Sequence, residues 1–107
     1  MEKDCPINNI MSVLSKKWTL IILYELNSNG RRRFNELIKG ANGISARTLS
    51  KRLKELEKID IIKRESFREI PPRVEYSLSS SGKKLVECFS YLGKWAEKWK
   101  NKGKKLI

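Results

Sequence analysis

Apolar residues recur with a helical period over the first part of the chain. A first run carries four of them at spacings of three and four: Ile7, Ile10, Met11 and Leu14. This spacing predicts an amphipathic helix. The helix is expected to open at Cys5-Pro6, because proline is well tolerated at the first helical position, which makes Cys5 the N-cap. The next segment, 18–26, is apolar nearly all round and is expected to lie in the middle of the core.

Turn residues at 27–30 are expected to end this second helix. The arginines at 31–33 then predict a short strand that enters a further helix, in which Phe34, Leu37 and Ile38 mark one apolar face. A Gly-containing turn at 40–43 follows. A short helix, such a turn and a second helix together form a helix-turn-helix arrangement.

The second helix of that arrangement is predicted over about 45–59, with Ser45 as its N-cap. One face is apolar and consists of Ala46, Leu49, Leu53 and Leu56. The opposite face carries four cations, namely Arg47, Lys51, Lys54 and Lys58, and Thr48 and Ser50 flank that row. An α-helix fits the major groove of B-DNA, where such side chains reach base edges and phosphates. We therefore interpret 45–59 as a recognition helix, although a solvated basic face is the simpler alternative.

Strand patterns follow at about 61–78. Val74, Tyr76 and Leu78 alternate with polar residues, which predicts a half-buried strand. Pro71-Pro72 cannot lie in a central ladder and therefore marks the loop of a hairpin. A hairpin directly after a recognition helix is a wing, and its tip is flanked by Arg68 and Arg73.

The last predicted helix covers about 80–101. Five apolar residues recur at spacings of four and three: Leu85, Phe89, Leu92, Ala96 and Trp99. Trp95 and Cys88 widen this seam, and Cys88 is interpreted as a plain core residue. The seam is more apolar than an outer helix of one small domain needs. Part of it is expected to close on the first helix and part to form a dimer interface, while purely internal packing is the alternative. The expected interface residues are Ile7, Ile10, Met11, Leu85, Phe89, Leu92, Trp95, Ala96 and Trp99.

Composition narrows the function. The 107 residues fit one domain, 1–107, and the net charge of +12 indicates a polyanionic partner such as nucleic acid. No run is apolar for long enough to span a bilayer and no signal peptide is visible, so a cytoplasmic protein without a membrane partner is expected. With 2 cysteines and 0 histidines, neither a disulfide framework nor a metal site is expected. No cofactor motif or catalytic constellation is present, which argues against an enzyme.

Several motifs in this order resemble a known family. They are Cys5-Pro6, Lys17-Trp18-Thr19-Leu20, Arg32-Arg33-Phe34-Asn35-Glu36-Leu37, Gly43-Ile44-Ser45 with the run from Arg47 to Leu56, and Pro71-Pro72-Arg73-Val74-Glu75-Tyr76-Ser77-Leu78. The chain resembles the HxlR-type branch of the MarR-like winged-helix regulators from Cys5 to about Gly93. Two positions depart from the family pattern: Ser15-Lys16 replaces small residues, often glycine, and Asp60 stands where glycine is frequent.

The resemblance implies a fold and a function. The expected fold is α+β and mainly helical, a winged helix-turn-helix with N- and C-terminal dimerisation helices. The expected function is a homodimeric transcriptional regulator, by our interpretation a repressor, that binds a near-palindromic promoter site. Members of the family with a cysteine at the position of Cys5 include sensors of quinones, aldehydes or oxidants. The partial positive charge of a helix N-terminus stabilises a thiolate there, whereas Glu2 and Asp4 oppose it. An inert cysteine is the alternative.

The candidate DNA contacts divide by expected role. Arg47 and Lys51 are the expected base contacts. The hydroxyl residues set the register through phosphate or base-edge bonds: Ser45, Thr48 and Ser50. Arg68 and Arg73 reach the adjacent minor groove or its phosphates. The remaining candidates are backbone contacts at most, or solvated charges: Lys54, Arg31 and Arg32. The alternative function is a non-enzymatic winged-helix module whose basic face binds nucleic acid or an acidic protein without sequence preference.

Overall fold

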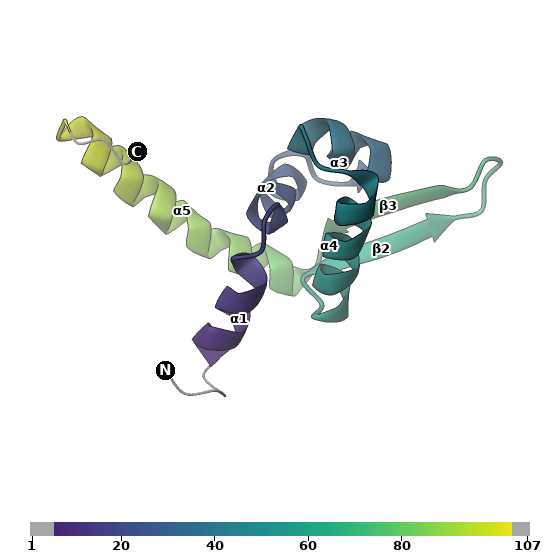
Figure 1. Cartoon of the computed structure of the whole chain (residues 1–107), viewed down its shortest axis with the longest axis horizontal. Coiled ribbons are helices and arrows are strands. Elements are labelled where there is room, and N and C mark those ends of the chain that lie inside the picture. The colour runs from purple at the N-terminus through teal and green to yellow at the C-terminus, as the bar shows by residue number, and fades with distance from the viewer. Residues whose placement is uncertain (1–5, 104–107) are drawn as a thin grey trace.

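The computed structural model describes residues 6–103, and Figure 1 labels its helices and its two longer strands. The elements follow in the order α1 (Pro6–Leu14), α2 (Thr19–Asn29), β1 (Arg32–Arg33), α3 (Phe34–Ala41), α4 (Ala46–Lys58), β2 (Ile62–Phe67), β3 (Arg73–Leu78) and α5 (Ser80–Asn101). The predicted mainly helical α+β fold with a helix-turn-helix and a wing is thus confirmed. The first helix begins at Pro6, as predicted.

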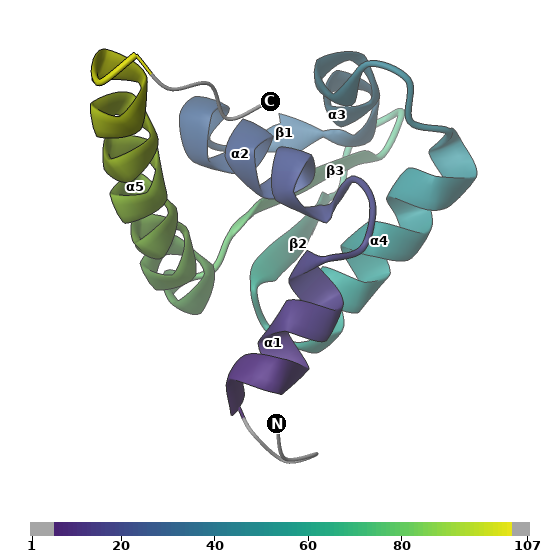
Figure 2. The ribbon, with the colours of Figure 1, turned by 60° about the vertical axis from the view of Figure 1, so that its left-hand side comes forward.

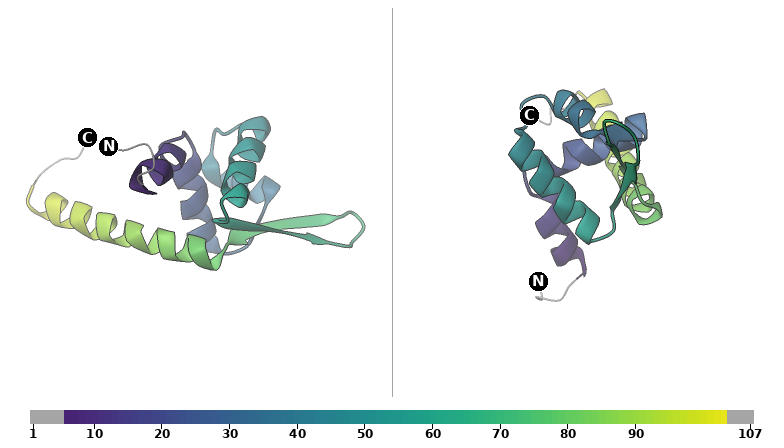
Figure 3. Two further views of the ribbon diagram at one scale, coloured as in Figure 1. Left: turned by 90° about the horizontal axis from the view of Figure 1, so that it is seen from below. Right: turned by 90° about the vertical axis from the view of Figure 1, so that its right-hand side faces the viewer.

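Helices α1 to α4 form a central body from which two long elements project in opposite directions (Figures 1 and 3). The hairpin of β2 and β3 extends to one side and α5 to the other, and the molecule measures 54 × 34 × 25 Å. After a 60° turn, α1 lies beside the C-terminal end of α4 (Figure 2). The hairpin is referred to below as the wing.

Within the described chain the strands form one antiparallel sheet in the order β1-β3-β2. The wing pairs from Ile62↔Leu78 at its base to Phe67↔Arg73 near its tip, so its loop is 68–72. The loop contains both prolines, which confirms the hairpin that they predict. The two-residue strand β1 adds to the other edge of β3 at Tyr76 and Glu75.

The core forms where the apolar faces of these elements meet. It consists of Leu14, Ile22, Leu23, Leu26, Leu37, Ala41, Ile44, Leu49, Leu53, Leu56, Ile61, Ile62, Leu78 and Val86. Three leucines of α4, Leu49, Leu53 and Leu56, are each at most 1% exposed. Burial of such side chains is worth about 1.5–3 kcal/mol each. This apolar seam fixes which face of α4 turns outward.

The end of α4, both ends of the wing and the start of α5 meet at one junction, made by Asp60, Ile61, Leu78, Ser79 and Gly82. Ser79 is the N-cap of α5: its hydroxyl accepts a hydrogen bond from the Gly82 amide at 2.9 Å and donates to the carbonyls of Asp60 and Ile61. The Ser79 amide also donates to the Ile61 carbonyl at 2.9 Å. A side chain at position 82 would overlap the Ile61 carbonyl oxygen, so glycine permits this approach. Asp60 adopts a left-handed conformation, with φ of 61°, which suits a position where glycine is frequent in the family.

Two expectations about the core are wrong. Segment 18–26 does not lie wholly in the core: α2 buries Ile22, Leu23 and Leu26 but leaves Leu20, Ile21 and Tyr24 exposed. The helix also continues through the polar residues at 27–29, and Gly30 is its C-cap. Cys88 is exposed rather than a core residue, because the inward side of α5 at this level is filled by Leu85 and Phe89.

Candidate nucleic-acid interface

The N-terminus of α4 is fixed by a local hydrogen-bond network. Ser45 has an extended backbone, and its hydroxyl accepts from the Thr48 amide at 3.1 Å, as predicted for an N-cap. The same hydroxyl donates to the Thr48 hydroxyl at 2.9 Å. The cap satisfies an amide that the first helical turn leaves unpaired. Both hydroxyls therefore already have a structural role at the exposed end of the helix.

Beyond this cap, the outward face of α4 is a row of cations without counter-charges. The row is Arg47, Lys51, Lys54 and Lys58, and all four are exposed. None of them forms an ion pair with any carboxylate in the described part of the chain. Since the leucine seam holds the opposite face in the core, these like charges stand side by side towards solvent. Such an arrangement favours a polyanion.

The two wing-tip arginines differ in their surroundings. Arg68 is exposed in the loop and has no ion-pair partner among residues 6–103. Arg73 lies 3.4 Å from Glu69 and 3.5 Å from Glu75, and its guanidinium packs over the Phe67 ring at 4.2 Å from the centroid. Arg73 is therefore held along the wing, whereas Arg68 projects without such constraint.

The predicted contacts Arg31 and Arg32 lie beside carboxylates. Arg31 approaches Glu65 at 3.2 Å and Glu75 at 3.6 Å, two carboxylates that are directly paired across the wing. Arg32 pairs with Glu36 at 3.0 Å. The Arg33 amide, which donates a hydrogen bond to Glu36, is the largest cause of the lowered pKa of that carboxyl, and the charge of Arg32 adds to it. Both arginines thus neutralise carboxylates of this chain.

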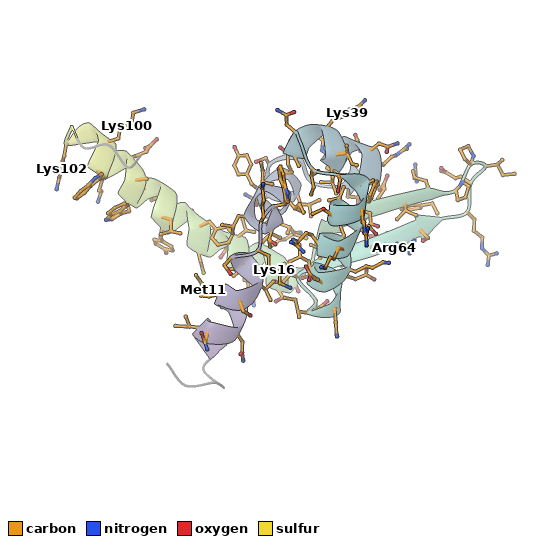
Figure 4. The ribbon with its side chains drawn as sticks, viewed as in Figure 1. Met11, Lys16, Lys39, Arg64, Lys100 and Lys102 are labelled. Atoms are coloured by element: carbon orange, nitrogen blue, oxygen red, sulfur yellow. The ribbon has the colours of Figure 1, made fainter. Side chains whose placement is uncertain are left out.

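Sequence reasoning missed a second set of contacts, which joins α4 to the turn between α1 and α2. Glu55 accepts from Lys16 at 2.7 Å and from Arg52 at 3.1 Å, and the Arg52 Nε donates to the Lys17 carbonyl at 2.9 Å. We call these four residues the linker clamp; Figure 4 labels Lys16 between α1 and α4. The hydrogen bond from Lys16 is the largest cause of the lowered pKa of Glu55. The partners lie 35 and 39 residues apart, a separation that no local pattern reveals.

The expected dimer residues separate into three groups by exposure. Ile10, Leu85 and Phe89 pack against the core of their own chain, and the groove of about 340 Å³ between α1, the end of α4 and α5 includes Ile10 and Leu85 in its lining. Ala96 is half-exposed. The other five are exposed: Ile7, Met11, Leu92, Trp95 and Trp99. The two tryptophans stack with ring centroids 5.3 Å apart.

The sensor candidate Cys5 lies outside the described residues. Within residues 6–103, no cluster of three or more potential ligands could hold a metal ion. In the same range, no helix is both long and apolar enough to cross a membrane.

Comparisons with known proteins identify the class. The HxlR-like helix-turn-helix family model matches residues 13–104. YdeP of Bacillus subtilis (strain 168), named as a helix-turn-helix-type transcriptional regulator, is 38% identical over 104 residues, which cover 97% of this chain and 80% of YdeP. A solved structure from Enterococcus faecalis V583, assigned to the MarR family of transcriptional regulators, has a TM-score of 0.84 and 40% identity, with 96% and 93% of the two chains covered. The oxidised form of the redox regulator HypR has a TM-score of 0.77 and 35% identity, with coverages of 88% and 96%.

The fold and these similarities therefore define a winged helix-turn-helix transcriptional regulator that binds DNA. The chain belongs to the HxlR-like helix-turn-helix family. This family and the relatives named above are regulators of transcription and not enzymes.

The linker clamp leads to a prediction about pH. The pKa of Glu55 is lower in the folded chain than the value of about 4.3 of an unfolded glutamate, so its ion pairs contribute stability above pH 4.3 and lose it as the pH falls through the lowered pKa. We expect Glu55→Gln to lower the free energy of unfolding at pH 7 by about 1 kcal/mol, a value typical of partly exposed pairs. Urea denaturation at pH 7 and pH 3 measures this difference.

Glu57→Gln is the matched control, because Glu57 is an exposed glutamate of the same helix without a clamp partner. It is expected to have a smaller effect at pH 7. A Glu55→Gln deficit that persisted undiminished at pH 3 would contradict the ion-pair explanation.

Proposed function

We propose that the whole chain, 1–107, acts as one winged helix-turn-helix domain that represses transcription as a homodimer on a near-palindromic promoter site. Helix α4 serves as the recognition helix of each subunit. The observation that carries this proposal is the row of unpaired cations opposite the buried leucines of α4. In a homodimer, two such helices enter major grooves about one helical turn apart. A protein bound over a promoter blocks access of the polymerase.

The DNA-contact residues are assigned by their surroundings. Arg47 and Lys51 lie in the first two turns of α4 without counter-charges and read base edges. The hydroxyls of Ser45, Thr48 and Ser50 fix the register. Lys54 and Arg68 contact phosphates. The ion-paired arginines contribute more weakly, because a phosphate must compete with their carboxylates: Arg31, Arg32 and Arg73.

Dimerisation accounts for the exposed apolar residues of α1 and α5. Trp95 and Leu92 are 53% and 66% exposed in the single chain, and Met11 is 52% exposed. Aromatic residues in this setting are typical of protein interfaces. Helix α5 projects away from the body, so its outer half packs against no other helix or strand of residues 6–103 (Figure 1). We assign Leu92, Trp95, Ala96 and Trp99 with Ile7 and Met11 to the interface. The other three expected residues, Ile10, Leu85 and Phe89, adjoin it and pack against the core of their own chain.

Thiol modification of Cys5 is proposed as the signal. The described helix begins at the next residue, Pro6, and a helix N-terminus stabilises a thiolate. The similar protein HypR is a redox regulator of which an oxidised form is solved. Modification beside the proposed dimer helix α1 can rotate one DNA-reading half relative to the other. An electrophile or an oxidant is the expected small-molecule partner.

The first prediction of this function concerns Arg47. Wild-type protein is expected to prefer the duplex upstream of its own gene over a scrambled duplex at near-physiological salt. If six to ten phosphates are neutralised per dimer, affinity falls roughly 10³- to 10⁵-fold between 50 and 200 mM salt. Arg47→Ala should lose about 1–3 kcal/mol of discrimination between the duplexes, as for a bidentate base contact. Fluorescence anisotropy titrations measure both quantities.

Lys58→Ala is the control, because Lys58 lies in the same row but at the opposite end of α4. Equal weakening of both duplexes by Arg47→Ala would make Arg47 a phosphate contact. A wild-type protein without any preference, tested against a wider set of promoter duplexes, would favour the sequence-independent binding module.

The dimer has its own test. Trp95→Glu places a charge within the proposed interface and is expected to shift the protein from dimer to monomer in analytical ultracentrifugation at micromolar concentration. Ser90→Glu adds the same charge on another face of α5, where Ser90 is exposed, and should leave the dimer intact. A wild-type protein that sediments as a monomer would contradict the assignment.

The sensor proposal is tested by repeating the duplex titration after treatment with diamide, which forms disulfides. Wild-type binding is expected to change and to recover when a thiol reductant is added, and Cys5→Ser should not respond. Cys88→Ser is the matched control, because Cys88 is exposed and is the other cysteine of the chain. A response that disappears in Cys88→Ser but persists in Cys5→Ser would contradict the proposal and show that Cys88 is the sensor.

A further inference from the structure

A groove of about 310 Å³ separates α4 from the wing. It is lined by Ser50, Leu53, Lys54, Glu57, Arg64 and Tyr76, and we call it the wing groove. Its floor is apolar: Leu53 is 1% exposed, and Tyr76 packs against the core. Figure 4 labels Arg64 beside α4 and over the wing. Ser50 and Lys54 belong to the proposed DNA contacts, whereas Arg64 belongs neither to these contacts nor to the proposed dimer interface.

Arg64 reaches the groove because of strand alternation in β2. It is paired with Tyr76 across the wing, and both line the groove next to α4. The preceding residue, Lys63, is paired with Ser77 and lines a different groove with Lys83 of α5. Neighbouring cations of one strand thus lie on opposite faces of the wing, as the period of two requires.

The charges of the wing groove are not balanced within the chain. Arg64 donates a hydrogen bond to the Ser66 hydroxyl at 3.2 Å. Neither Arg64 nor Lys54 forms an ion pair with a described carboxylate. Glu57 lines the groove without pairing with either cation. Both cations are exposed at the rim of the same groove, so a single anion placed between them is attracted by both.

We propose that the wing groove holds a phosphate of the DNA backbone, with Lys54 and Arg64 on either side of it and the Ser50 hydroxyl as a further donor. The inference rests on the proposed function, because Lys54 belongs to the cation row of α4 that faces the same duplex. The phosphate fixes the position of the duplex between recognition helix and wing. Glu57 limits affinity, since its carboxylate faces the same anion.

The test compares Arg64→Ala with Lys63→Ala, which removes the same charge from the adjacent, equally exposed position. Affinity for the promoter duplex and for a scrambled duplex is measured from 50 to 300 mM salt. Arg64→Ala should weaken both duplexes about tenfold and lower the slope of log K against log salt by about 0.9 per subunit, or about 1.8 per dimer. Lys63→Ala should leave the slope unchanged.

Two further variants separate charge from shape. Arg64→Lys keeps the cation and should restore most of the slope, whereas a purely structural role of the guanidinium would give no such rescue. Glu57→Gln should raise the affinity for both duplexes a few-fold. Circular dichroism and urea midpoints establish that each variant is folded.

The outcomes distinguish the two proposals. A wild-type protein that prefers its promoter duplex, combined with equal slopes for Arg64→Ala and Lys63→Ala, would overturn the wing-groove inference and leave the regulator intact. A slope loss confined to Arg64→Ala without any sequence preference of the wild type would support the groove as a phosphate site but contradict the promoter-specific function. Failure to bind any duplex would overturn both.

Discussion

The close approach of Gly82 to the Ile61 carbonyl is the constraint on which the geometry of the interface depends. The same carbonyl receives the Ser79 amide and the Ser79 hydroxyl, so one peptide group connects the end of α4 to the start of α5. Both strands of the wing leave this junction, since β2 begins at Ile62 and β3 ends at Leu78. The angles among recognition helix, wing and α5 are therefore set at a single buried site.

Helix α4 is held on three sides, and each side uses different physics. Its leucines fix the inward face by hydrophobic burial. The linker clamp ties one flank to the α1–α2 turn through Arg52 and Glu55, and the other flank faces the wing across the wing groove. The Lys16–Glu55 ion pair joins the turn after α1 to α4, so under the proposed function a displacement of α1 would be passed to the recognition helix through this pair. This path supplies a physical route by which a thiol signal can alter DNA binding.

The sequence predicted the helices and the wing well, because both depend on local order. The helical period of α4 and the Pro71-Pro72 turn are each contained in a short stretch of sequence. Contacts between distant segments could not be predicted from such stretches, because the linker clamp spans 39 residues and the ion pair of Arg31 with Glu65 needs the folded wing. The wrong expectation that segment 18–26 lies wholly in the core has the same cause. The apolar residues of a helix do not reveal whether they are covered by their own chain or by another one. The roles of the predicted contact residues stay predictions.

The net charge of +12 indicates a polyanion but not where it lies. The location follows from how the wing divides its charges between its two faces. On one face, Glu65 and Glu75 pair with Arg31 and Arg73, so these four charges largely cancel, and Lys63 lies near the base of the same face. On the other face, Arg64 forms no ion pair within residues 6–103 and lines the wing groove together with residues of α4. We therefore propose that a duplex lies on the side of the wing that adjoins α4, where Arg64 adds to the cations of the helix, and that the glutamates of the wing weaken binding to the opposite side.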